Sequence, residues 1–86
     1  MIQKIHAPIS VVSVFNHHKR QFKPVKLLWE GREYSVIKVG LHHTYREGEI
    51  LFHIFSVETT SLFFRIVFNT NSLFWFVEEI SDGEPN

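Results

Sequence analysis

Histidine is the residue type best suited to chemistry in this sequence, because six occur among 86 residues. His17–His18 and His42–His43 are adjacent pairs, while His6 and His53 stand alone. Adjacent side chains on extended backbone point to opposite faces, so neither pair alone can chelate one metal ion. A zinc site needs about three or four ligands, so it would require one histidine from each pair together with His53 or a carboxylate such as that of Glu47. The spacing matches no zinc signature. We therefore expect exposed loop histidines, no metal and no cofactor, and metal binding by the two pairs stays an open question.

Catalysis by a nucleophile or a carboxylate pair is the second chemistry to consider. Serines, histidines and carboxylates are all present, but the sequence has no Gly-x-Ser-x-Gly elbow. Glu78 and Glu79 are neighbours at the end of an expected strand, so their carboxylates diverge. These patterns predict a protein that is not an enzyme.

Nucleic-acid binding is the third, because residues 17–26 form a compact basic stretch. Lysine and arginine side chains can neutralise phosphates while an aromatic ring, Phe22 or Trp29, stacks on a base. A solvated loop beside an edge strand explains the same composition, and the formal net charge of zero is unlike a dedicated binder. We keep a nucleic-acid-binding module as the alternative function. Its residues would be Lys19, Arg20, Phe22, Lys23 and Lys26.

Charge is unevenly distributed along the chain. Residues 1–46 carry eight lysines and arginines and two acidic residues, whereas residues 47–86 carry one arginine and seven acidic residues. Such asymmetry indicates either an anionic partner for the first half or two halves whose charges mix on one folded surface.

The elements that position these residues read as strands, because apolar residues recur with period two or in short β-branched and aromatic runs. Expected strands cover residues 9–15, 25–29, 32–41, 50–57, 62–68 and 73–77, the last with an extension towards residue 80. A loop is expected at 16–21 and a loop or a frayed hairpin end at 42–49, and Glu30-Gly31 suits a hairpin turn. Residues 1–80 form one domain, and residues 81–86 are expected to be a flexible acidic tail.

Short turns between six strands predict an all-β fold with no helix. We expect a single antiparallel meander of about six strands, forming a strongly curled sheet or a small, partly open SH3-like barrel. Without cysteine, stability must come from buried apolar area, much of it aromatic. The aromatic residues expected in the core are Trp29, Tyr34, Phe64, Phe68 and Trp75.

The strands at 62–68 and 73–77 are apolar on both faces, whereas antiparallel strands with one solvated face alternate. A chain of 86 residues has little material left to cover a second apolar face. Either this sheet lies at the centre of a sandwich, or a partner chain covers it. Because six strands hardly provide a complete second layer, we expect a protein partner or a homodimer, so that the chain acts as a protein-interaction or self-association module. The expected interface residues are Phe63, Phe74 and Phe76.

The cellular location follows from absent signals. The first eight residues contain no apolar signal-peptide core, and nowhere do about 18 apolar residues run together. Together with the lack of cysteine, this predicts a cytoplasmic protein without membrane association.

Four motifs carry a resemblance that spans most of the chain. They are Ala7-Pro8-Ile9-x-Val11, Pro24-Val25-x-x-x-Trp29-x-Gly31-Arg32-x-Tyr34-x-Val36, Phe64-Arg65-Ile66-Val67-Phe68-Asn69 and Trp75-Phe76-Val77-Glu78-x-Ile80. The chain resembles a group of small uncharacterised prokaryotic β-domains and is similar to segments that close the carboxyl ends of some accessory proteins related to translesion DNA polymerases. It departs from them at residues 41–45, where relatives often carry tryptophan. The resemblance implies an all-β fold and no enzymatic activity.

Overall fold

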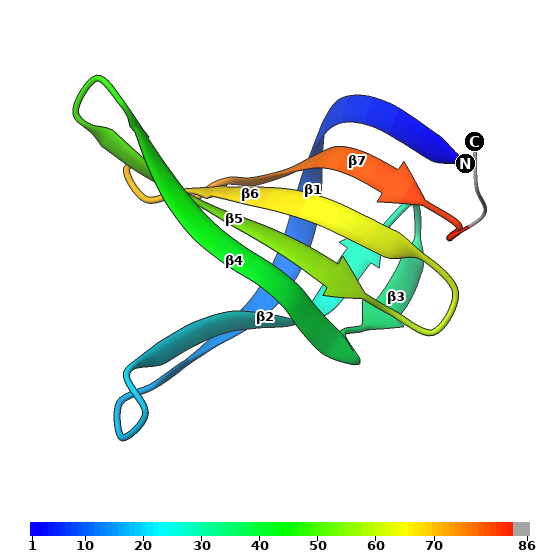
Figure 1. Cartoon of the computed structure of the whole chain (residues 1–86), viewed down its shortest axis with the longest axis horizontal. Coiled ribbons are helices and arrows are strands. Elements are labelled where there is room, and N and C mark those ends of the chain that lie inside the picture. Colours follow the sequence, from blue (N-terminus) through cyan, green and yellow to red (C-terminus); the bar gives the residue numbers. More distant parts are fainter. Residues whose placement is uncertain (84–86) are drawn as a thin grey trace.

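The computed structural model describes residues 1–83 as seven β-strands without a helix (Figure 1). The strands are β1 (Ile2–Asn16), β2 (Gln21–Trp29), β3 (Arg32–Ser35), β4 (Lys38–Glu47), β5 (Ile50–Glu58), β6 (Phe63–Asn69) and β7 (Trp75–Ser81). The described residues include no helix with the length and hydrophobicity needed to cross a membrane. The all-β prediction is confirmed.

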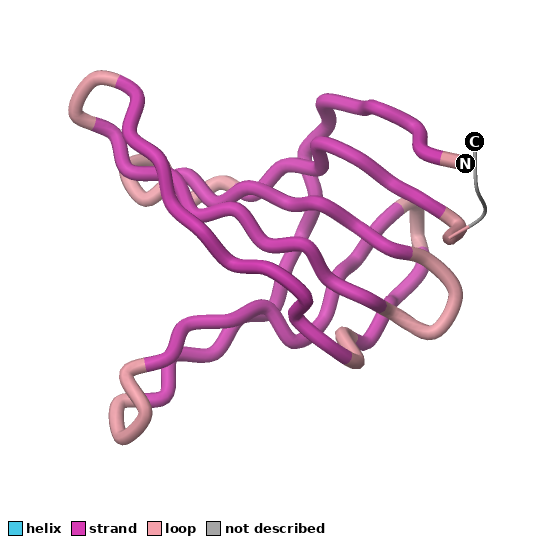
Figure 2. The backbone as a smooth tube through the Cα atoms, viewed as in Figure 1, coloured by secondary structure: helices cyan, strands magenta, loops and turns pink. Residues whose placement is uncertain are grey.

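All seven strands belong to one antiparallel sheet with the order β3-β2-β1-β7-β6-β5-β4 (Figure 2). The last strand therefore pairs with the first, and β3 and β4 form the two outer edges. The count exceeds the expected six because the third predicted strand is divided. Val36 donates its N–H to the Val25 carbonyl, and Ile37 donates to that of Glu58. Two neighbouring residues thus bond to opposite ends of the sheet, which separates β3 from β4.

The sheet is curled into a half-barrel because β1 serves two partners along its length. Residues Ile2–Ile9 pair with β7, whereas Ser10–Asn16 pair with β2. Shifts in register interrupt both ladders, and such bulges bend and twist a sheet. One shift lies beside Pro24, which has no N–H to contribute to the ladder.

The main core fills the concave side of this curled sheet. Leu27, Phe55, Phe64, Ile66 and Val77 are all buried there, each contributed by a central strand. Among the aromatic residues expected in the core, Phe64 and Trp75 are buried, while Trp29, Tyr34 and Phe68 pack around them partly buried.

A smaller apolar cluster lies on the convex side of β5, β6 and β7. Phe52, Ile54 and Val67 are buried in it, and Phe76 packs against them. The central part of the second apolar face is therefore covered by the strands themselves. Exposed apolar side chains remain elsewhere, among them Val12 and Val14 of β1, Phe63 of β6, and Phe74 before β7, which changes where a partner can bind.

Two expected boundaries differ from the structure. Residues 42–47, expected to be a loop or a frayed hairpin end, continue β4 and pair with β5 as far as Glu47↔Ile50. Residues 2–8, outside the first expected strand, extend β1 because they pair with β7. Both segments are polar or mixed in sequence and become strands through their neighbours.

The expected tail begins as part of the fold. Ser81 ends β7, and the Met1 amino group donates to Asp82 Oδ1 at 2.6 Å. Gly83 packs against the ring of Phe63. The remaining tail residues, 84–86, lie outside the described residues.

Candidate functional site

A large groove runs along β1 beside the turn that precedes β7. Its volume is about 590 Å³. One wall is the segment of β1 from His6 to Val11, and the other is the segment from Leu73 to Phe76. The groove lies where β1 parts from β7, because Ile9↔Trp75 is the last pair between these strands.

The turn at residues 69–74, which we call the interaction turn, is held by Asn69. The Asn69 side-chain oxygen accepts the N–H groups of Asn71 at 2.8 Å and Ser72 at 3.0 Å. The Asn69 backbone accepts from the Leu73 N–H at 2.8 Å and donates to the Phe74 carbonyl at 2.9 Å. The asparagines had predicted a turn here, and the structure confirms it.

Leu73 adopts a backbone conformation that bulky residues avoid, with φ of 66°. This left-handed region costs an L-residue roughly 1–2 kcal/mol. The side chains of Leu73 and Phe74 are 67% and 73% exposed. The turn therefore holds two apolar side chains in solvent, at a cost in backbone strain.

The three expected interface residues do not form one patch. Phe74 precedes β7, while Phe63 lies opposite Ser81 at the other end of the strand, about 20 Å away at the usual rise per residue. Phe76 is partly buried in the convex cluster, with the His6 ring 4.6 Å from its own. Phe74 and Phe76 both line the groove, but only Phe74 is widely exposed.

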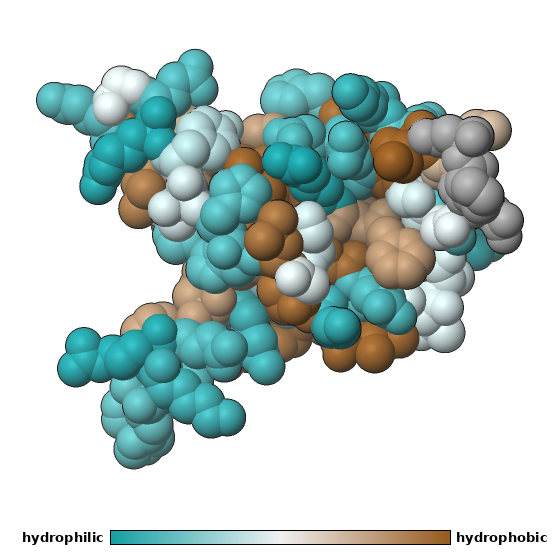
Figure 3. Space-filling view, in the orientation of Figure 1, coloured by the Kyte–Doolittle hydropathy of each residue, from teal (hydrophilic) through white to brown (hydrophobic). Residues whose placement is uncertain are grey.

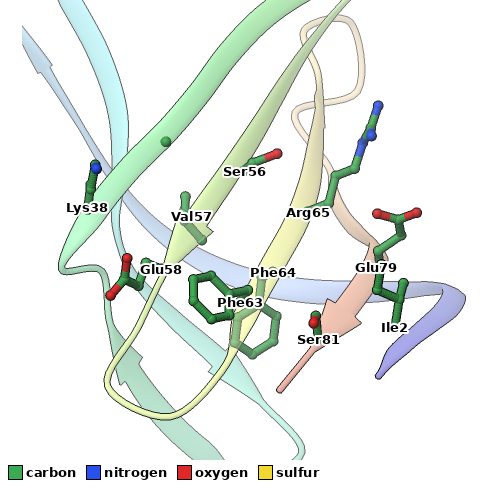
Figure 4. Close-up of a pocket in the computed structure, with 11 residues that line it drawn as sticks. Ile2, Lys38, Ser56, Val57, Glu58, Phe63, Phe64, Arg65, Glu79 and Ser81 are labelled. Atoms are coloured by element: carbon green, nitrogen blue, oxygen red, sulfur yellow. The ribbon is translucent and has the colours of Figure 1, made fainter. Parts of the chain in front are cut away.

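A second pocket, of about 220 Å³, lies beside Phe63 on the convex side of β4 to β7 (Figure 4). Figure 4 shows Lys38 and Glu58 on one side of this pocket and Arg65 and Glu79 on the other. Arg65 Nε lies 3.0 Å from Glu78 Oε1, an ion pair without an aligned hydrogen bond. Charges of both signs without a convergent set favour no particular ligand.

The basic stretch forms the hairpin between β1 and β2, which projects from the sheet in Figure 1. Lys19, Arg20 and Lys23 are exposed, and no ion pair joins them to another described residue. Lys26 lies 3.5 Å from Glu33. Phe22 is partly buried among the core aromatics, with ring centroids 5.3 Å from Phe68. The structure thus leaves the charges exposed and packs the aromatic ring inward.

Five of the six histidines lie on the β1–β2 and β4–β5 hairpins, which are separated by a hollow (Figure 3), whereas His6 lies beside Phe76 on the part of β1 that pairs with β7. His42 Nε2 and His53 Nδ1 are 2.8 Å apart on the core side of β4 and β5, where one ring donates to the other. The His42 ring stacks on Phe55 at 4.1 Å. His43 faces the other side of β4, and the His17–His18 rings contact each other in the β1–β2 turn.

The fold brings His42 of β4 and His53 of β5 together from different strands. Burial lowers the pKa of His42, and the nearby charges of His53 and His43 lower it further. Burial also lowers the pKa of His53. Across residues 1–83, no three histidine or acidic side chains converge as a metal would require. The pair is suited to hydrogen bonding and to responding to pH.

Comparison of the chain with protein-family models, curated proteins and solved structures finds no match. The resemblance carried by the four sequence motifs stays a prediction. The function must therefore be inferred from the surfaces described above.

The sequence prediction missed the role of β1 and of Leu73. Two signals were present: apolar residues on both faces at Val11-Val12 and Val14-Phe15, and an apolar pair, Leu73-Phe74, directly after an asparagine-rich turn. Their proximity depends on the pairing of β1 with β7, which no local pattern reveals.

Proposed function

We propose that the chain is a non-enzymatic protein-interaction module that works in the cytoplasm, binding another protein or a second copy of itself. The contact surface is the interaction turn together with the groove along β1. One observation carries the proposal: a turn braced by Asn69 holds Leu73 at positive φ and leaves its side chain and that of Phe74 in solvent. Exposed apolar groups beside a groove are characteristic of binding sites, and strained backbone concentrates at functional positions.

Site-specific photo-cross-linking in the source cell tests this function. A benzophenone amino acid replaces Phe74 in one variant and Phe63, the matched exposed aromatic at the far end of the sheet, in another. We expect position 74 to give a discrete protein adduct that is lost when Leu73→Ser is added, and position 63 to give none. Equal adducts at both positions, or none at position 74, would contradict the proposal. An adduct of twice the chain mass identifies self-association.

The alternative function is nucleic-acid binding through the β1–β2 hairpin. It is favoured by the exposed, unpaired Lys19, Arg20 and Lys23 in a segment, residues 10–29, that contains no acidic residue. Titration of a single-stranded DNA oligomer and a duplex RNA tests it. Binding that weakens steeply with salt and is lost in the Lys19→Ser, Arg20→Ser, Lys23→Ser variant would support it. Absence of binding at low salt rejects it.

A further inference from the structure

The carboxyl-terminal part of β1 has one open backbone edge. Ser10–Asn16 pair with β2 on one side, but β7 stops pairing with β1 at Ile9. The chain that would continue β7 along this edge turns away at Leu73. In an antiparallel ladder alternate residues direct their N–H and C=O groups to opposite sides, so about half of this segment offers unpaired groups.

The side chains along this edge are apolar and exposed. Val12, Val14 and Phe15 project from it into solvent, and Leu73 and Phe74 stand at its beginning. Val12 and Val14 share the outer face of the hairpin, whereas Phe15 lies opposite Phe22 and shares the core face. An extended segment laid along this edge would gain backbone hydrogen bonds and cover apolar side chains on both faces.

The charge around the edge is mainly positive. Glu33 of β3 lies 3.5 Å from Lys26, but on the far side of β2 from this edge. Val14 lies opposite Lys23 and Val12 opposite Lys26, and Lys19 and Arg20 form the tip of the same hairpin. Residues 10–29 contain no acidic residue, and the interaction turn carries no charge. An acidic partner is therefore complementary to this surface, whereas a basic one is repelled.

We propose that the groove and the open edge of β1, residues 10–16, bind an extended, acidic segment of another protein by strand addition. This rests on the proposed function and names its partner: a strand that alternates apolar and acidic side chains. The strand occupies the place beside β1 that β7 leaves free, with one of its ends against Leu73 and Phe74. The exposed edge of β4 lacks such one-sided charge, because Lys38 and Arg46 are accompanied by Glu47.

Fluorescence anisotropy with the full chain and labelled synthetic peptides tests the proposal. The probe is a peptide of about eight residues, a common strand length, alternating valine and glutamate. The controls are a valine–lysine peptide and the valine–glutamate peptide with alternate backbone nitrogens methylated. We expect saturable binding of the first that weakens with salt, and binding at least about tenfold weaker for both controls.

Matched variants locate the site. Val14→Glu and Phe74→Ala are each expected to weaken binding about tenfold. The controls are Leu41→Glu, on the β4 edge, and Phe63→Ala, at the far end of the sheet, and both should leave peptide binding unchanged. Leu41 matches Val14 in exposure, at 51% and 44% respectively. Circular dichroism shows whether each variant is folded. If Val14→Glu is unfolded, the effect of Phe74→Ala on peptide binding decides the outcome.

Several results would overturn the proposal. Equal binding of the acidic and basic peptides would do so, as would equal effects of the Val14 and Leu41 substitutions. In a third test the acidic peptide is tethered to the chain by a flexible linker, which raises its local concentration to about the millimolar range. Absence of protection of the Ser10–Asn16 amides in this tethered chain would also overturn the proposal. A dimer that Val14→Glu dissociates would assign the edge to a second copy, and a DNA oligomer protecting the same amides would assign it to nucleic acid. If the peptide fails while position 74 still cross-links a protein, the proposed function stands and only this partner is rejected.

Discussion

At the scale of single residues, Leu73 is where stability and binding are expected to conflict. Its positive φ is unfavourable for leucine but not for glycine, and its exposed side chain contributes little to the core. We expect Leu73→Gly to raise the free energy of unfolding by about 1 kcal/mol, measured by urea denaturation. Leu73→Ala keeps the strain and serves as the control. A destabilised Leu73→Gly variant would show that the leucine side chain holds the fold.

The His42–His53 pair gives the fold a dependence on pH. Both pKa values are lowered by burial, so between the folded pKa and the ordinary value of about 6.5 the unfolded chain binds more protons than the folded one. Stability is therefore fully present above about pH 6.5 and falls as the pH drops through this window. Urea denaturation between about pH 8 and pH 5 measures it.

Replacement of both rings tests that assignment. The His42→Gln, His53→Gln variant should show a shallower decline in stability towards acid than the natural chain. An unchanged slope in the double variant would assign the decline to other groups.

At the scale of elements, two adjacent residues at the start of β7 differ sharply in burial. Trp75 is buried, with its ring 4.7 Å from Phe68, whereas Phe74 is largely exposed. Trp75→Ala should cost about 3–5 kcal/mol of stability by leaving a cavity. Phe74→Ala should stay within about 0.5 kcal/mol because its ring faces solvent. Similar losses in the two variants, by urea denaturation, would contradict this division.

Central strands were predictable because burial imposes a pattern on their sequence. The expected strands at 50–57 and 62–68 correspond closely to β5 (Ile50–Glu58) and β6 (Phe63–Asn69), and the Glu30-Gly31 turn forms with φ of 49° and 79° as a hairpin turn requires. The exposed ends of β1 and β4 carry no alternation. Pairing with β7 and β5 makes them strands, and that information lies elsewhere in the chain.

At the scale of the whole molecule, the site depends on how far β1 and β7 run together. The sequence predicted apolar excess near the carboxyl end, but Phe52 and Ile54 of β5 cover the middle of that face beside Val67. Of the three residues predicted for an interface, Phe74 and Phe63 are exposed but lie at opposite ends of β7, and Phe76 is partly buried. The open edge of β1 arises only because two strands part at Ile9, a property of topology.

The central claim is that this edge of β1 is where a partner strand adds. Residue-resolved amide hydrogen exchange measures it directly, with the free chain compared to the chain saturated with the valine–glutamate peptide. We predict that the amides of Ser10–Asn16 directed away from β2 exchange rapidly in the free chain and become protected on binding, while those on the outer edge of β4 do not change. Protection that appears on β4, or is absent from Ser10–Asn16, would contradict the account.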